Sequence, residues 1–258
     1  MRLQHVIHVM KRISLTLIYI LCIGLSWAHA QERRVQNRPY TDLRPFHFGV
    51  IVGTHAQDID FRNVGPHLVE TEEGGMVEKT IVTDQDRWDV GFTVGVLGKF
   101  RLSEFFQFRI APALHFGTRH LTLRNLTDLT PEGLPIEQHQ EMKTAYMSSA
   151  FDLIFAAPRF NNHRPYIMAG INPLVNLSAK SDDYIKLKPF DLCVEVGVGC
   201  DFYLPFFKLR PELKFMYGLT NSIDSKHADQ LKDRNMRMYT QSVDKATTKM
   251  VVLSFYFE

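Results

Sequence analysis

Cysteine is scarce in this 258-residue chain, and its scarcity excludes a disulfide scaffold. One of the three cysteines, Cys22, lies in an apolar N-terminal segment. The other two, Cys193 and Cys200, fall on one predicted strand about 23 Å apart at 3.3 Å per residue, whereas disulfide-bonded Cα atoms lie within about 7 Å. We therefore expect no intramolecular disulfide, and an exported chain without one needs another source of stability, such as a closed sheet.

Long apolar runs are absent after the first thirty residues. Residues 1–30 have the form of a secretory signal peptide, because Arg2, Lys11 and Arg12 precede an apolar stretch and Ala28-His29-Ala30 resembles a cleavage site. The alternative, a transmembrane anchor, needs about 20 apolar residues, and this stretch has about 15. If the remaining chain spans a membrane, it does so with strands.

An excess of one charge is also absent. Removing residues 1–30 lowers Lys and Arg from 30 to 27 against 28 Asp and Glu, so the balance becomes −1 instead of +2. No global attraction to nucleic acid follows, and we expect no nucleic-acid partner. Metal-ligand spacing is absent; His115 with His120, and Asp182 with Asp183, are weak metal candidates. We expect no cofactor, no metal and no small-molecule substrate.

What the chain does have is strict alternation. Between Phe190 and Leu219, odd and even positions separate an apolar face from a polar or charged face on two consecutive segments. Because strand side chains alternate with period 2, these segments form a hairpin with one apolar and one charged face. The strands are roughly 12 to 14 residues long, against a usual length of about 5 or 6. Such length, with charges opposite the apolar face, is typical of outer-membrane β-barrels.

The same pattern predicts an all-β fold, a small antiparallel transmembrane β-barrel of about eight strands with meander topology. The predicted strands share alternation and end near short turns; they are 46–55, 88–100, 106–118, 144–155, 166–177, 190–203, 208–219 and 249–258. The other connections are longer and polar and are predicted as extracellular loops; they are about 56–87, 119–143, 178–189 and 220–247. We divide the chain into a signal peptide (1–30), a periplasmic lead-in (31–45) and an outer-membrane barrel (46–258).

The predicted inward face is rich in charge. An eight-stranded barrel has an interior that side chains can fill, and buried charges are costly unless they are paired. The balance of acids and bases predicts an ion-pair network that plugs the lumen, formed by Lys99, Arg109, Asp152, Glu195, Asp201, Arg210, Glu212 and Lys214; His47 and Asp89 also face inward. A polar conduction path is the alternative.

Aromatic residues gather beside the short turns, where one membrane interface would hold an aromatic girdle. They are Phe100, Phe105, Phe106, Phe155, Phe160, Tyr166, Phe202, Tyr203, Phe206, Phe207, Tyr256 and Phe257. The alternative is that they form the core of a soluble β-domain.

Catalysis has weak support in the sequence. A hydrolase would need a nucleophile beside a histidine and an orienting acid, and His115, Ser148, Ser149 and Asp152 are candidate parts. No G-x-S-x-G elbow or comparable signature surrounds them. We therefore expect no catalytic site.

Four short motifs stand out along the predicted barrel. They are Arg44-Pro45-Phe46-His47-Phe48-Gly49, Arg164-Pro165-Tyr166 through Gly170 and Asn172, Glu195-Val196-Gly197-Val198-Gly199-Cys200-Asp201-Phe202-Tyr203, and Phe207-Lys208-Leu209-Arg210-Pro211-Glu212-Leu213. These motifs resemble those of the PorT family, small outer-membrane β-barrels from Bacteroidetes. The resemblance spans roughly residues 40 to 258, and Cys200 stands where a larger apolar residue is expected. It implies a role in type IX secretion, which exports cargo bearing a C-terminal signal, and in gliding relatives a link to motility. No enzymatic residues come with the family.

The resemblance makes a non-enzymatic outer-membrane component of type IX secretion the leading hypothesis, with outer-membrane lipid and other secretion-system proteins as partners. A generic outer-membrane barrel for adhesion or membrane integrity is the alternative. A lipid-modifying enzyme is the second alternative. The 220–247 connection is either a solvated loop or a contact site for another protein.

Overall fold

The computed structural model describes residues 35–70, 75–178, 184–224, 227–231 and 234–258. The predicted signal peptide and Asp182-Asp183 lie outside this part of the chain. The strands are β1 Phe46–Asn63, β2 Pro66–Glu70, β3 Met76–Asp84, β4 Asp89–Arg101, β5 Phe106–Leu129, β6 Pro135–Ala156, β7 His163–Asn176, β8 Phe190–Tyr203, β9 Lys208–Gly218 and β10 Val243–Phe257. The helices are α2 His227–Gln230, α3 Arg234–Gln241 and a 3-10 turn at Thr41–Leu43.

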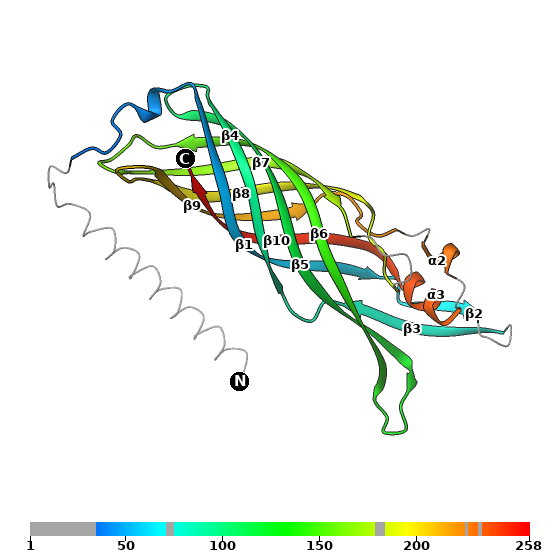
Figure 1. The fold of residues 1–258 in the computed structure, drawn as a ribbon. Coiled ribbons are helices and arrows are strands. Elements are labelled where there is room, and N and C mark those ends of the chain that lie inside the picture. Colours follow the sequence, from blue (N-terminus) through cyan, green and yellow to red (C-terminus); the bar gives the residue numbers. More distant parts are fainter. Residues whose placement is uncertain (1–34, 71–74, 179–183, 225–226, 232–233) are drawn as a thin grey trace, which may run out of the picture. The chain divides into compact units, whose positions relative to one another are not determined.

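Strand pairing closes eight of these strands into a ring. Figure 1 shows the barrel that they form. Neighbours pair antiparallel in the order β5-β4-β1-β10-β9-β8-β7-β6, and β6 pairs back to β5. β2 and β3 lie outside the ring, attached to β5 through residues 81–84. The prediction of an all-β antiparallel meander barrel is confirmed. Among the described residues, no helix is long and apolar enough to cross a membrane.

The strands reach further than the sequence predicted. β5 and β6 pair through most of the 119–143 stretch that was predicted as a loop, and they turn at residues 130–134, where Gly133 has a φ of +80°. β1 continues to Asn63, β2 and β3 occupy much of 66–84, and β10 begins at Val243. The prediction of long irregular loops was therefore wrong for these stretches. In Figure 1 the β5–β6 hairpin extends past the neighbouring strands.

The barrel wall has two halves that differ in which side is apolar. We call the half beside the short turns the turn half, and the half beyond it the loop half. On β1 in the turn half, Val50 and Val52 point outward and are exposed, while His55 is buried inside. In the loop half of the same strand, Ile59 is buried inside and Asp60 points outward.

An apolar cluster fills the interior of the loop half. Its buried members come from the barrel strands, from β2 and β3 and from the connections at the mouth; they are Ile59, Val69, Ile81, Leu121, Leu123, Met142, Ile185, Leu187, Ile223, Met238, Tyr239, Val243 and Ala246. Met238 and Tyr239 belong to α3, so part of the 220–247 connection packs into the mouth and is not a solvated loop. The loop-half interior is therefore closed by apolar side chains.

The lead-in is fastened to the turn end of the barrel. The Asn37 side chain donates to the Tyr203 carbonyl at 2.9 Å, and the Tyr203 hydroxyl donates to the Asp42 carboxylate at 2.7 Å. The Arg38 guanidinium donates to the carbonyl of Glu258 at 3.0 Å. Residues 37–45 thus contact both the β8 end and the chain terminus.

Candidate functional site

The turn half of the lumen begins with a cluster of charges around the last residue of the chain. Lys99 Nζ lies 2.7 and 2.9 Å from the two carboxylate oxygens of Glu258, and Lys208 also pairs with this carboxylate. Arg210 donates to Asp201 through two nitrogens, one of them at 3.0 Å, and its third nitrogen lies 3.5 Å from Glu258. These side chains are almost fully buried, and each charge lies beside an opposite charge.

A second cluster, centred on Arg109, lies next to the first and further from the short turns. Its guanidinium donates to both oxygens of Glu212 at 2.7 and 2.8 Å and to Asp152 at 2.8 Å. Tyr166 and Tyr256 each donate a hydroxyl to Glu212 at 2.7 Å. The Arg109 charge also lies 4.6 Å from the centre of the Tyr256 ring, a cation–π distance. Every oxygen of Glu212 therefore has more than one donor.

Lys214 and Glu195 complete this set on β9 and β8. Lys214 Nζ lies 3.1 Å from Glu195, and Asn172 donates to the other Glu195 oxygen at 2.7 Å. The structure thus brings all eight residues of the predicted network into the lumen as ion pairs. With Lys208 and Glu258, five cations face five carboxylates; they are Lys99, Arg109, Lys208, Arg210 and Lys214 against Asp152, Glu195, Asp201, Glu212 and Glu258.

The sequence reasoning missed four residues of the network. Lys208 shares the parity of the inward residues of β9, and Glu258, directly after β10, shares the parity of the inward Tyr256, but the predicted inward set did not include them. Tyr166 and Tyr256 were assigned to the aromatic girdle, as was Tyr203, and this was wrong because all three are buried in the barrel. Tyr166 on β7 and Tyr256 on β10 have even numbers, so they point to the side of the wall opposite the outward Ile167 and Phe257. Period-2 parity was the signal that distinguishes them.

Outward aromatic rings do line the turn end of the barrel. The Phe46 and Phe100 rings are tilted against each other with their centres 5.0 Å apart, and the centres of the Phe106 and Phe155 rings lie 5.2 Å apart. These side chains are exposed on the barrel exterior. Their position is that of an interfacial girdle.

Beyond the ion pairs, further from the short turns, lies a layer of hydroxyl and imidazole side chains. The Thr93 hydroxyl is 2.9 Å from both His55 Nδ1 and His115 Nδ1, and His115 Nε2 is 3.0 Å from the Ser148 hydroxyl. Two catalytic candidates, His115 and Ser148, are therefore in contact. Ser149 has the opposite parity and points to the other side of the wall, and Asp152 is bound to Arg109. A catalytic triad would need an acid beside His115, and the side chain in that place is Thr93. The His115 and Ser148 side chains are both buried in the barrel interior.

The remaining inward or metal candidates do not join these clusters. His47 contacts the Thr41 carbonyl at 2.8 Å at the turn end. Asp89 lies at the other end of β4 and pairs with His120 at 2.9 Å. His115 and His120 have opposite parity on β5, so they face opposite sides of the wall. Within the described part of the chain, no group of three His, Cys, Asp or Glu side chains has the geometry to hold a metal ion.

Beyond the barrel, β2, β3 and the loop halves of β5 and β6 form a four-stranded sheet, which we call the loop sheet. Its outer surface carries ion pairs: Lys79 with Asp128, and Arg124 with Asp86 and Glu137 at 2.8 Å each. The hydrogen bond from Lys79 lowers the pKa of Asp128 below its ordinary value. Leu126, Leu129 and Leu134 are exposed near its tip. Surfaces of this kind on a rigid scaffold are suited to contact with other molecules.

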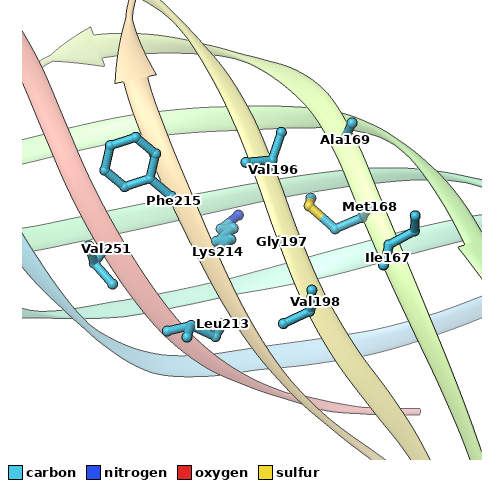
Figure 2. A pocket seen from close by; sticks show the side chains of 10 residues that line it. All are labelled: Ile167, Met168, Ala169, Val196, Gly197, Val198, Leu213, Lys214, Phe215 and Val251. Carbon is cyan, nitrogen blue, oxygen red and sulfur yellow. The ribbon is translucent and has the colours of Figure 1, made fainter. Parts of the chain in front are cut away.

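The outward face of the turn half is a continuous apolar surface. A shallow groove of about 480 Å³ lies on this surface. Figure 2 shows side chains that line it, among them Val196, Val198, Leu213 and Phe215, with Ala169 on the neighbouring strand. Lys214 lies between Leu213 and Phe215 on β9, but its side chain points into the lumen toward Glu195. Apolar side chains outside and ion pairs inside are the arrangement expected of a wall in contact with lipid.

Comparison with protein families decides the assignment. The model of a family described as outer membrane protein beta-barrel domain matches residues 29–224. The chain belongs to this family. Members of the outer membrane β-barrel family reside in the outer membrane, and this chain is an integral outer-membrane β-barrel protein.

Solved outer-membrane structures share low sequence identity with this outer-membrane barrel. Neisserial surface protein A (NspA) has 10% identity and a TM-score of 0.42, covering 83% of this chain and 98% of its own. OprG from Pseudomonas aeruginosa has 12% identity and a TM-score of 0.43, covering 81% and 91%. Ail, the attachment invasion locus protein of Yersinia pestis, has 10% identity and a TM-score of 0.36, covering 83% and 99%. No curated protein matches this chain.

Proposed function

We propose that this outer-membrane barrel is a non-enzymatic component of the type IX secretion system that supports export of cargo bearing a C-terminal signal. Four motifs that resemble the PorT family support the proposal, and three of them supply network residues. Tyr166 comes from the first of these three, Glu195 and Asp201 from the second, and Lys208, Arg210 and Glu212 from the third. In gliding relatives, the same role includes a link to motility. The proposed partners are outer-membrane lipid and other secretion-system proteins.

The observation that carries the proposal is the filled lumen. Ion pairs occupy the turn half and an apolar cluster occupies the loop half, so the barrel acts through its surfaces instead of conducting cargo or ions. The mature barrel in a planar lipid bilayer should give no steady conductance. A stable, ion-selective current would contradict this part of the proposal.

Deletion of the gene in its native bacterium tests the secretion role. We expect C-terminal-signal cargo to accumulate in the periplasm, and the intact gene supplied in trans should restore export. Normal export in the deletion strain would reject the proposal. Normal export together with altered surface binding or detergent sensitivity would instead support the adhesion or membrane-integrity alternative, for which the exposed leucines of the loop sheet are the specific observation.

The lipid-enzyme alternative is tested through the contact between His115 and Ser148. We expect Ser148→Ala, Ser149→Ala and His115→Ala to leave the lipid composition of the outer membrane unchanged. A lipid change specific to Ser148→Ala and His115→Ala, with Ser149→Ala as the matched control, would contradict the non-enzymatic proposal.

A further inference from the structure

Prolines interrupt the strand pairing at two places on one side of the barrel. Between β4 and β5, pairing is lost where the flanking register sets Val96 opposite Pro112. Between β6 and β7, it is lost where the register sets Ser149 opposite Pro173. Each proline stays paired with the strand on its other side, so its nitrogen faces the interrupted ladder. Because proline has no N–H to donate, the carbonyls of Val96 and Ser149 lack their donor from the neighbouring strand.

The fold replaces the missing donor elsewhere, but not at these two carbonyls. Pro165 lies opposite Ala157 and accepts from its N–H, so Pro165 leaves the Ala157 carbonyl without a strand donor in the same way. Arg164 Nε donates to that carbonyl at 2.7 Å instead. Within the described part of the chain, no side chain donates to the carbonyl of Val96 or of Ser149.

Lipid covers both carbonyls. The outward residues on either side of them along β4 and β6 are apolar and exposed; among them are Val94, Phe100, Met147 and Leu153. Hydrocarbon offers no hydrogen-bond donor, so an unsatisfied carbonyl at this depth is costly. The ladder between β8 and β9 is interrupted as well, at Pro211, but the opposing Cys200 lies near the outward ring of Phe202 at the turn end. Headgroups and water supply donors there.

One hydrogen-bond donor in the same place is also unused. Four outward residues lie side by side across β4, β5, β6 and β7, and we call them the strip; they are Val96, Pro112, Ser149 and Pro173. The Ser149 hydroxyl has no hydrogen bond among the residues that the structure describes. By contrast, the outward hydroxyl of Thr54 on β1 donates to the carbonyl of Gly91 in its own wall at 2.9 Å. The strip therefore presents one free hydroxyl beside two free acceptors.

A second copy of this chain supplies the donor that lipid lacks. In a two-fold contact the same patch of both copies meets, so a contact centred on Ser149 sets the hydroxyl of each copy beside the Ser149 carbonyl of the other. The two hydrogen bonds that form replace the two that Pro173 removes, one in each copy, and no bond within either copy is broken. Hydrogen bonds from serine to a neighbouring chain favour association inside membranes.

We infer that the strip is the contact between two copies of this barrel in the membrane. Proline breaks the ladder within each copy, and the Ser149 hydroxyl of the other copy provides the donor that the ladder has lost. The inference goes beyond the proposed function and does not depend on it.

Sedimentation equilibrium of the full mature barrel in density-matched micelles tests the association. We expect the unaltered barrel to form dimers and Ser149→Ala to weaken them at least about tenfold, since two hydrogen bonds between the copies are lost. Ser149→Thr keeps the hydroxyl and should keep the dimer. Thr54→Val is the matched control, because it removes an outward hydroxyl that is bonded within its own copy, and it should leave the association unchanged. An unaltered barrel that stays monomeric, as it would if lipid or another protein covers the strip, would overturn the inference. Equal association of the unaltered barrel and Ser149→Ala would do the same.

Pro173→Ala separates the contact from general damage to the wall. Alanine restores the N–H that faces Ser149, so the monomer should resist higher urea concentrations while the dimer weakens about tenfold. Photoreactive benzoylphenylalanine in place of Met147 should crosslink two barrels in lipid vesicles. The same group in place of Val251 on β10, four strands away from β6 in the ring, should not. Unchanged association of Pro173→Ala, or crosslinking from Val251 and not from Met147, would contradict the assignment of the contact to the strip.

Discussion

The turn half and the loop half of the barrel are built from the same strands with opposite sides apolar. Along β1, Val50 and Val52 face outward and Gln57 faces inward, whereas two residues further Ile59 faces inward and Asp60 outward. β5 changes in the same way between the inward Arg119 and the inward Leu121. The strand direction and its alternation continue without a break through this change.

The difference shows that the medium around the barrel, lipid or water, determines whether charged or apolar side chains fill its interior. In the turn half, lipid covers the outer face, so apolar residues gain nothing from turning inward and the lumen can hold paired charges. In the loop half, water covers the outer face and burial of apolar surface again stabilises the fold. The two halves should therefore respond differently to the same kinds of substitution.

The largest expected effect is in the ion-pair network of the turn half. Glu212→Leu removes the carboxylate that accepts from Arg109 and two tyrosines, and it should destabilise the barrel by about 3–5 kcal/mol because a buried charge loses its partner. Urea unfolding from lipid vesicles measures this. Glu132→Gln, at the exposed tip of the loop sheet, is the control and should change stability by less than about 0.5 kcal/mol. Equal effects would mean that the lumen is wet and screens its charges.

A charge on the lipid-facing side of the turn half should come next. Val196→Arg or Leu213→Arg should cost about 2–4 kcal/mol at mid-membrane depth in the same unfolding assay. Lys245→Glu, a charge change of opposite sign on the exposed loop half, should cost far less. If arginine at Val196 were tolerated as well as the Lys245 change, the outward face of the turn half would be in water.

A smaller effect separates the two apolar surfaces. Ile59→Val, in the apolar cluster of the loop half, should cost about 0.5–1.5 kcal/mol because a buried methylene is lost from a packed core. Ile167→Val, on the exposed outer face of the turn half, should change stability little, since lipid chains contact either side chain equally well. A larger loss for Ile167→Val than for Ile59→Val would reverse the assignment of the two halves.

The smallest effect concerns acid sensitivity of the loop sheet. The pKa of Asp128 is lowered in the fold by the Lys79 hydrogen bond, so its contribution is present above the unfolded pKa of about 3.9 and is lost as the pH falls through the lower folded value. The protection of β3 amides, which is their exchange rate compared with that of the unfolded chain at the same pH, should fall in that range. Asp128→Asn should remove this pH dependence while the turn-half strands of either protein keep their protection. Unchanged acid sensitivity in Asp128→Asn would contradict the assignment.

Sequence reasoning succeeded where lipid imposes a strict pattern and failed where the pattern inverts. The alternation around Val196 and Leu213 predicted both the membrane strands and the eight charges inside. The same reasoning predicted 119–143 as a loop because the stretch is long and polar. In the structure Leu121 and Leu123 alternate with Thr122 and Arg124 on a continuing strand, and the apolar residues now face inward. Tyr256 was misplaced because its aromatic character was weighed above its parity.

Other features depend on long-range geometry that no local pattern contains. The contact of Glu258 with Lys99 joins the residue that follows β10 to a residue on β4, and the two approach only when β10 pairs with β1 and closes the ring. The packing of Met238 and Tyr239 into the mouth likewise depends on where the chain returns after β9. These contacts follow from closure of the sheet, so the sequence alone predicts the types of residue inside but not the full set of pairs.

Spin labels along β1 in nanodiscs test the inversion most directly. Labels at Phe48, Val50 and Val52 should be accessible to oxygen and shielded from a water-soluble nickel complex, while labels at Asp60 and Arg62 should show the opposite accessibility. This result is predicted if lipid covers the turn half and water covers the loop half. Strong nickel accessibility at Val50 and Val52, equal to that at Asp60, would contradict the account.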